Sequence, residues 1–139
     1  MIAASLPALV LLLAAGADLP AARNRTEQVR FCDAKPEELP VLVRAVSSAG
    51  PVSERILAAS ERFLGVRYVR DPLGEGPGSP PDADPLLRYD AVDCTTFVET
   101  VIALARKADG ELQTTLNDLR YDGPVSYANR NHFFVAHWL

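Results

Sequence analysis

The chain has 139 residues, of which 48% are apolar, and a formal net charge of −4. This length fits one small domain with a single hydrophobic core and excludes a second domain of ordinary size. The acidic balance and the lack of a stripe of Lys and Arg argue against a nucleic-acid-binding protein, because binding to phosphates needs clustered positive charge.

An apolar run lies near the N-terminus, over residues 5–17. It is too short to span a bilayer, and it ends in Ala-Gly-Ala, a pattern typical of a secretory signal cleaved after Ala17. Residues 1–4 carry no Lys or Arg, which departs from the usual signal and leaves an apolar N-terminal helix as the alternative. We expect residues 1–17 to be a signal peptide that directs the chain to the periplasm or the extracellular space, with no stable membrane span.

Two amphipathic helices are expected after a linker that covers residues 18–35. The first occupies residues 36–48, where apolar side chains recur at helical spacing, and Gly50 with the proline after it stops this helix. Ser53 is expected to cap the second helix, which ends at Gly65. We interpret both helices as packing elements. The side chains expected to face inward from the second helix are Ile56, Leu57, Ala59, Phe63 and Leu64.

Residues 66–69 are expected to form a short strand or an extended segment, and residues 71–85 are expected to form a loop. Five prolines and three glycines in the loop are too many for any regular element. The loop is either a flexible surface insertion or one wall of a binding cleft. We favour the insertion, because its residues are not chemically distinctive.

A helix is expected from about residue 94 to residue 108, because apolar side chains recur there with a period near 3.6 residues. A glycine two residues further on can end it. Asp90 or Asp93 can cap its start, whereas a capping box of Thr96 with Glu99 would begin the helix two residues later. The face expected to be buried consists of Phe97, Val98, Val101, Ile102 and Ala105.

Cys94 lies in the first turn of this helix or just before it. There the unpaired backbone N–H groups and the helix dipole favour a thiolate, the reactive form of a nucleophilic cysteine. The alternatives are a buried small hydrophobic residue, or half of a disulfide with Cys32, which an oxidising compartment would promote. A core-packing cysteine needs neither the aspartate before it nor the two threonines after it, so we predict a catalytic role.

After this helix we expect a short helix over residues 111–119, a turn at 122–124 and a strand over 132–136. His132 and His137 lie at the end of the chain. The two histidines and two cysteines do not complete a zinc site, because a pair of thiolates at ligand spacing is missing. We therefore expect no metal ion and no cofactor.

Four short motifs occur in order along the second half of the chain. Residues 93–99 read Asp-Cys-Thr-Thr-Phe-Val-Glu. Residues 63–68 contain Leu-Gly-Val-Arg-Tyr, residues 119–123 read Leu-Arg-Tyr-Asp-Gly, and residues 127–134 contain Arg-Asn-His-Phe. These motifs resemble, respectively, the nucleophile motif, the domain entry, the helix exit and the Arg-Asn-His-Phe segment of the DUF1460 family, a branch of the NlpC/P60 papain-like cysteine peptidases. The resemblance covers residues 50–139.

The resemblance implies an α+β fold of the papain-like NlpC/P60 type. It also implies an N-acetylmuramoyl-L-alanine amidase, which hydrolyses the amide between the lactyl group of muramic acid and L-alanine in peptidoglycan fragments. Cys94 would be the nucleophile. We assign Asp93, Arg130 and His132 to substrate binding, and we expect muropeptides as partners. The sequence does not indicate an oligomeric state.

In the resembling family the catalytic histidine lies on a strand after the Arg-Asn-His-Phe segment, in a His-Val-Gly-like context. The sequence ends at Leu139, so we expect residues 36–139 to be the N-terminal part of a single amidase domain that lacks the later strands and the catalytic histidine. Three functions stay open. They are an amidase whose chain is truncated, a catalytically inactive remnant that binds muropeptides, and a non-enzymatic exported helical interaction domain.

Overall fold

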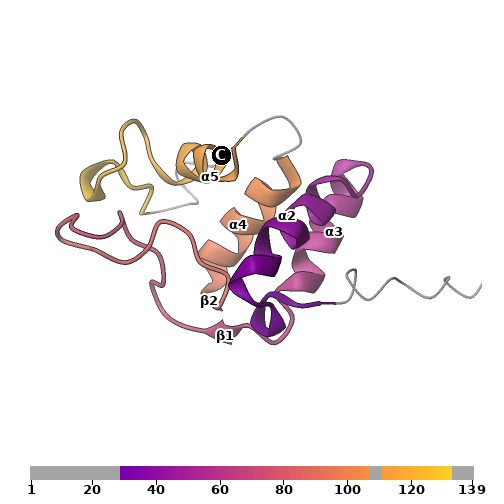
Figure 1. The fold of residues 1–139 in the computed structure, drawn as a ribbon. Coiled ribbons are helices and arrows are strands. Elements are labelled where there is room, and N and C mark those ends of the chain that lie inside the picture. The colour runs from indigo at the N-terminus through magenta and orange to yellow at the C-terminus, as the bar shows by residue number, and fades with distance from the viewer. Residues whose placement is uncertain (1–28, 107–110, 133–139) are drawn as a thin grey trace, which may run out of the picture.

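The computed structural model describes residues 29–106 and 111–132. Within these ranges the chain forms four α-helices and a two-stranded parallel sheet, so its class is α+β, as expected (Figure 1). The expected signal peptide, His137 and most of the strand expected over 132–136 lie outside the described residues. Three short 3-10 helices are also present in these ranges: η1 (Phe31–Asp33), η2 (Pro36–Glu38) and η4 (Tyr127–Asn129).

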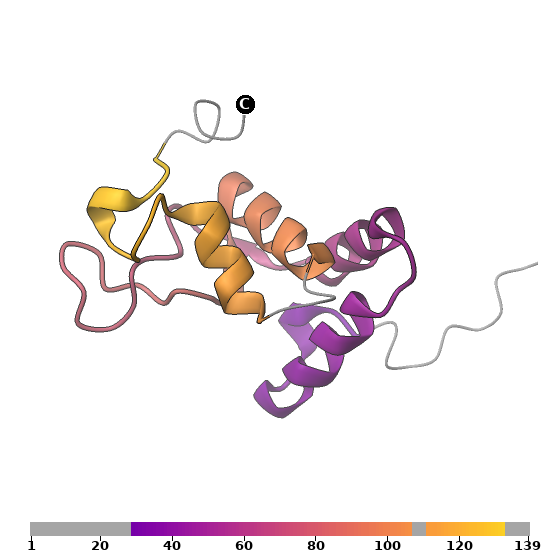
Figure 2. The same cartoon turned by 90° about the horizontal axis from the view of Figure 1, so that it is seen from above.

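A parallel strand pair leads into the central helix. β1 (Arg67–Tyr68) pairs with β2 (Ala91–Val92), and β1 confirms the strand expected near residues 66–69. One residue after β2 the chain enters α4 (Cys94–Arg106), which confirms the helix expected from about residue 94 to residue 108. α4 contacts all three of the other described α-helices, so the strand pair delivers Cys94 to one end of the central element (Figures 1 and 2).

The two helices expected before the strands are confirmed. They are α2 (Leu39–Ser47) and α3 (Val52–Arg62), joined through Gly50 at a φ of +71°, a left-handed conformation that glycine adopts without strain. α3 begins directly after Pro51, whose extended backbone precedes the first turn. Ser53 therefore lies inside that turn, and its predicted role as the cap is wrong.

The inward face of α3 is narrower than the sequence indicates. Its buried stripe consists of Ala59, Arg62 and Phe63, and the ring of Phe63 packs edge-on against Phe97 of α4, with 5.6 Å between ring centres. α3 packs mainly on α4, so it buries one stripe, and the side chains beside that stripe point to solvent. Three side chains predicted to face inward are exposed for this reason: Ile56 by 40%, Leu57 by 58% and Leu64 by 61%.

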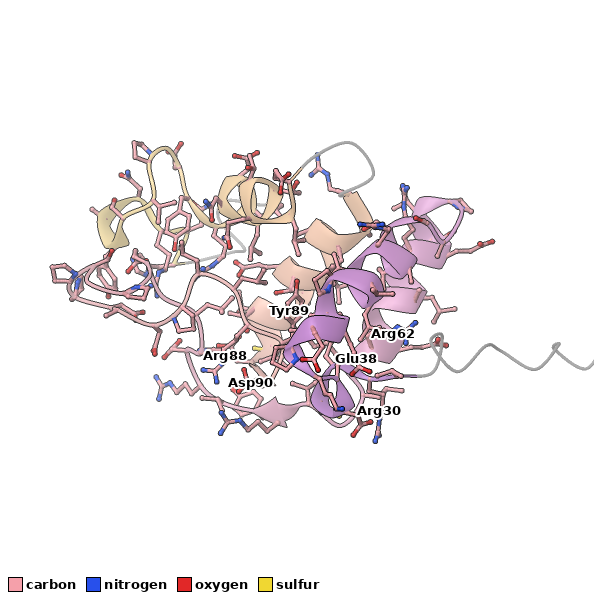
Figure 3. All side chains as sticks on the ribbon, in the orientation of Figure 1. Arg30, Glu38, Arg62, Arg88, Tyr89 and Asp90 are labelled. Atoms are coloured by element: carbon pink, nitrogen blue, oxygen red, sulfur yellow. The ribbon has the colours of Figure 1, made fainter. Side chains whose placement is uncertain are left out.

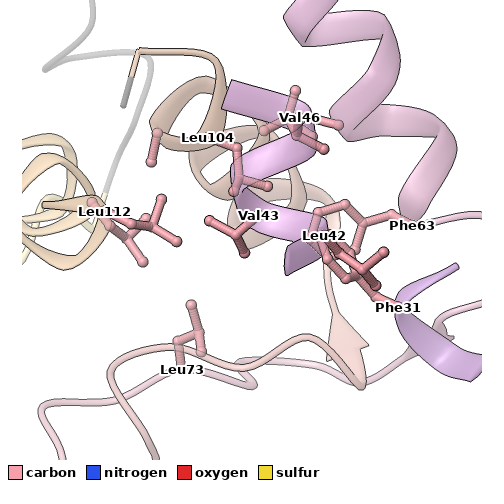
Figure 4. Close-up of a cluster of buried hydrophobic side chains, with 12 residues drawn as sticks. Phe31, Leu42, Val43, Val46, Phe63, Leu73, Leu104 and Leu112 are labelled. Carbon is pink, nitrogen blue, oxygen red and sulfur yellow. The ribbon is translucent and has the colours of Figure 1, made fainter. Parts of the chain in front are cut away.

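The core gathers side chains from every described α-helix and from the segments before α2 and after β1 (Figure 4). Phe31 of η1 is 3% exposed, and its ring lies 4.8 Å from the ring of Phe63 and 4.6 Å from that of Tyr89. Phe31 lies within residues 18–35, which were predicted to be a linker. Its aromatic side chain buries a large apolar area, so the core includes part of that segment. The labelled members in Figure 4 are Phe31, Leu42, Val43, Val46, Phe63, Leu73, Leu104 and Leu112.

The buried face of α4 differs from the predicted one. Val101 and Ala105 are buried as expected, but Val98 is 37% exposed, and Phe97 and Ile102 are half-buried. Neighbours on several sides of α4 cover positions that a single amphipathic stripe would leave open. The additional buried side chains are Thr96, Glu99, Thr100, Ala103 and Leu104, three of which are polar.

Residues 71–87, called loop 71–87 below, double back between β1 and β2. Residues 72–76 are buried, and their backbone pairs with residues 82–85. The N–H of Gly74 donates to the carbonyl of Pro85 at 3.1 Å. The N–H groups of Glu75 and Gly76 donate to the carbonyls of Asp82 and Asp84, at 3.1 and 2.8 Å respectively. The interpretation as a flexible surface insertion is therefore wrong for residues 72–76, since this limb is packed and hydrogen-bonded.

The final described segment starts with α5 (Leu112–Arg120), which confirms the helix expected over residues 111–119. Beyond it, Tyr121 forms an isolated antiparallel bridge with Arg130 across the bend expected at 122–124. Among the helices that the structure describes, none combines the length and the apolar character needed to cross a membrane.

Candidate active site

Asp93 fixes the start of α4. Its Oδ1 accepts hydrogen bonds from the backbone N–H and the hydroxyl of Thr96, both at 2.8 Å, while the N–H of Asp93 donates to Oγ1 of Thr96 at 2.9 Å. This reciprocal pair satisfies donors that the first helical turn leaves open. Of the alternatives, the cap at Asp93 is confirmed, and the later start through Thr96 and Glu99 is wrong because Asp93 engages Thr96.

Cys94 is the first residue of α4, and it is exposed. Among the described residues, its Sγ has a polar contact with the hydroxyl of Thr95, at 3.9 Å. Cys94 and Cys32 are both free thiols. An exposed sulfur at the positive end of a helix fits neither a core-packing residue nor half of a disulfide, and it matches the setting of a nucleophilic cysteine.

An exposed group of charges stands beside the strand that leads to Cys94. Arg88 donates to both carboxylate oxygens of Asp90 at 2.8 and 2.6 Å, and Arg67 of β1 donates to Asp90 Oδ2 at 3.1 Å; Figure 3 shows Arg88 and Asp90 together. The hydrogen bonds from Arg88, and then those from Arg67, hold the pKa of Asp90 well below its usual range. Asp90 is thus occupied by two arginines rather than capping α4.

A buried ion pair joins α4 to α5. Oε2 of Glu99 lies 3.5 Å from Nε of Arg120, and the two side chains are 5% and 4% exposed. Burial raises the pKa of Glu99 to about 7, although the positive charge of Arg120 opposes this. Arg120 also donates to the carbonyls of Leu73 and Gly74 at 3.1 and 3.4 Å. The same guanidinium therefore holds both α4 and the first limb of loop 71–87.

A second arginine, Arg130, also holds this loop. Nε of Arg130 donates to Oε1 of Glu75 at 2.7 Å, and Nη2 donates to Oδ2 of Asp82 at 2.8 Å. The hydroxyl of Tyr121 donates toward the carbonyl of Gly74, at 3.1 Å. The two arginines and their carboxylates thus form one polar network across four segments. We call its charged members, Glu75, Asp82, Glu99, Arg120 and Arg130, the charge cluster.

The predicted site residues fall into two groups. Asp93 and Cys94 lie together at the start of α4, and loop 71–87 joins them to Arg130, because the N–H of Asp71 donates to Oδ2 of Asp93 at 3.2 Å. His132 instead contacts Tyr127, with Nε2 3.0 Å from its carbonyl oxygen and 4.7 Å between the rings. Within residues 29–106 and 111–132, no three His, Cys, Asp or Glu side chains group in a way that could hold a metal ion.

The sequence did not indicate that Glu75, Glu99 and Arg120 join Arg130 in one polar network. A signal for Arg120 was present, since it continues the buried stripe of Leu112 and Leu116 in steps of four residues. A charge on the buried stripe of a helix requires a partner, because an unpaired buried charge is costly. No comparable local signal marks Glu75, which lies in a loop.

The family and structure comparisons agree. A family model described as AmiA-like, N-acetylmuramoyl-L-alanine amidase-like, matches residues 58–139. The crystal structure of protein LPG0564 from Legionella pneumophila str. Philadelphia 1, with the family model DUF1460, is 35% identical in sequence and superposes with a TM-score of 0.59. The match covers 68% of this chain and 33% of that one, so the chain spans about a third of the length of its structural relative. A search of curated proteins found no match.

Proposed function

This chain belongs to the N-acetylmuramoyl-L-alanine amidase-like family, and from that premise we propose a cysteine-dependent amidase of peptidoglycan fragments, with Cys94 as the nucleophile. One observation carries the proposal: Asp93 caps α4 so that an exposed, free thiol stands on the first residue of the central helix. The positive end of the helix dipole then favours the thiolate.

In the proposed reaction the Cys94 thiolate attacks the lactyl carbonyl carbon of an N-acetylmuramoyl-L-alanine peptide. The carbon–nitrogen bond breaks as the leaving amine of L-alanine takes up a proton, and water then hydrolyses the thioester. Backbone N–H groups at the start of α4 would stabilise the oxyanion. The reaction also needs a general acid and base, and within the described residues no imidazole contacts Cys94, since His132 bonds to Tyr127.

The predicted substrate residues enter the proposal in two ways. Asp93 and Arg130 would act through what they hold, respectively the start of α4 and loop 71–87. His132 is exposed and would face the substrate rather than serve as the base. We also propose a papain-like NlpC/P60 framework, in which a cysteine at a helix start is the nucleophile, and export to the periplasm or the extracellular space.

A second candidate function is binding of muropeptides without hydrolysis. The observation that favours it is the contact of His132 with Tyr127, which leaves Cys94 without an imidazole neighbour among the described residues. Proton transfer by a positioned base contributes about 10² to 10⁴-fold to such reactions, so a protein without one would bind far better than it cleaves.

The test is release of the L-alanine amine from an N-acetylmuramoyl-L-alanine peptide by the purified protein. We expect Cys94→Ala to abolish release and the matched control Cys32→Ala to retain it. Release that survives Cys94→Ala would contradict the proposed nucleophile. If no variant cleaves, calorimetry with the same peptide decides the alternative: measurable affinity supports the binding protein, and no affinity leaves a non-enzymatic interaction domain.

A further inference from the structure

Loop 71–87 has few apolar anchors of its own. Pro72 and Leu73 are buried near its start, Leu87 packs against the core cluster at its end, and the loop contains no helix or strand. Such a segment normally moves, because little apolar surface opposes its conformational entropy. Between these apolar ends, its position must therefore come mainly from its polar contacts.

Those contacts hold the loop at three places. Near its start, Asp71 adopts a φ of +48°, rare for a residue with a side chain, and donates to Asp93, the cap residue before Cys94. In its first limb, Arg120 binds the carbonyls of Leu73 and Gly74. Across its two limbs, Arg130 bridges the carboxylates of Glu75 and Asp82 (Figures 1 and 2 show the loop beside the segment after α5).

The side chains of Arg120 and Arg130 are also too buried to bind other groups freely. The side chain of Arg120 is 4% exposed and that of Arg130 is 15% exposed, and each faces a buried carboxylate. A buried ion pair does little for stability compared with apolar packing, but it fixes the groups that it joins in one geometry. The charge cluster is thus built to set the position of the loop relative to α4.

We infer that loop 71–87 is a fixed wall of the muropeptide site, and that Arg120 and Arg130 are positioning residues that hold this wall beside Cys94. The inference rests on the proposed function for the identity of the ligand. It assigns Arg130 an indirect part in substrate binding, through Glu75 and Asp82, rather than a direct contact with the substrate.

The first measurement is hydrogen–deuterium exchange in the full chain, at the amides of Gly74, Glu75 and Gly76. Arg130→Gln removes the bridge between the two limbs, so we expect these amides to exchange at least about tenfold faster, with the amides of α2 unchanged. Arg30→Gln is the matched control, since it removes an exposed pair with Asp33 elsewhere on the surface. Unchanged exchange at the loop amides in Arg130→Gln would overturn the role of Arg130.

The second measurement compares affinity for an N-acetylmuramoyl-L-alanine peptide with the rate at which iodoacetamide modifies Cys94. In Arg130→Gln we expect the Kd for the peptide to rise about tenfold, while the labelling rate stays within about twofold. A purely structural role would move neither or both. Faster loop exchange with an unchanged Kd would overturn the wall, because the loop would then be loose without consequence for the ligand.

Gly74→Ala provides a second test of the wall in case the Arg130→Gln variant does not fold. A Cβ at Gly74 would clash with Oδ1 of Asp82 and lie 2.7 Å from the backbone nitrogen of Asp84, so the limbs must separate although both arginines are kept. We expect the same loss of affinity with unchanged Cys94 labelling, and retained affinity would count against the wall. If the unaltered protein neither binds nor cleaves the peptide, the proposed function and the wall both fail, whereas the exchange result still decides whether the charge cluster holds the loop.

Discussion

Cys94 and Cys32 are both exposed free thiols, yet they stand in different electrostatic settings. Cys94 begins a helix of 13 residues, so it lies at the end where the aligned peptide dipoles leave a partial positive charge. Cys32 lies in the three-residue turn η1, and its sulfur lies 3.6 Å from the carbonyl oxygen of Leu64. The thiol of Cys32 thus donates to a backbone carbonyl, and it has no comparable helix start beside it.

We therefore predict that iodoacetamide at neutral pH modifies Cys94 several times faster than Cys32, on the order of fivefold or more. Mass spectrometry of peptides from the labelled, folded chain measures both rates in one sample. Cys32→Ser is the control that reports Cys94 alone. Equal rates for the two thiols would show that the helix terminus does not activate Cys94.

At the scale of the element, the cap of α4 connects stability with the site. Asp93 is 9% exposed, and both of its carboxylate oxygens accept hydrogen bonds, one from Thr96 and one from Asp71. Loss of this side chain removes the cap and releases the start of loop 71–87 at the same time. Loss of the cap affects the whole of α4, since every later turn of the helix continues from the first.

We predict that Asp93→Ala lowers the free energy of unfolding by about 0.5 to 2 kcal/mol, the usual cost of losing a helix cap. Asp93→Asn should lose less, because asparagine caps helices nearly as well. The matched control is Asp90→Ala, an exposed aspartate three residues earlier that does not cap the helix, and urea unfolding compares the three. Loss of muropeptide affinity in Asp93→Ala without loss of stability would point to a direct role in binding instead.

The sequence was sufficient to locate the helices because their signals are local. The aspartate before Cys94, the apolar period and the glycine and proline stops all act within a few residues. It was not sufficient to say which faces are buried, because that depends on neighbours distant in the chain. Val98 and Leu57 follow the helical period and are nevertheless exposed, whereas Glu99 and Arg120 are buried.

At the scale of the whole molecule, buried Glu99 makes stability depend on pH. Desolvation raises its pKa from 4.5 to about 7, and the negative charge of Asp93 adds to the rise, while Arg120 and Arg130 oppose it. Below pH 4.5 the carboxyl is protonated in both the folded and the unfolded chain. As the pH rises toward 7 the unfolded chain releases this proton first, so stability falls across that range.

We predict that the free energy of unfolding falls by on the order of 3 kcal/mol between pH 4.5 and 7 through this one group, and then levels off. Glu99→Gln should lack this component, so the difference in stability between Glu99→Gln and the unaltered protein should change in favour of the variant as the pH rises. Urea unfolding of both proteins at pH 5, 6, 7 and 8 measures it. A difference that stays constant over this range would refute the assignment.

The charge cluster shows why the site could be predicted only in part. Cys94 and Asp93 are neighbours in sequence, so one motif was enough to predict both as site residues. Glu75 and Arg130 are 55 residues apart, and only the folded chain brings them within 2.7 Å of each other. A loop with five prolines and three glycines carries no periodic pattern from which its buried limb could have been inferred.

The division of loop 71–87 into an anchored base and an exposed tip has an evolutionary consequence. Residues 77–81 lie mostly at the surface, beyond the contacts of both arginines. Doubling the length of a loop costs only about 0.6 kcal/mol in closure entropy, so insertions at this tip are thermodynamically cheap. Relatives of this chain can therefore differ in the length and sequence of the tip without losing the contacts of the two arginines that hold the base.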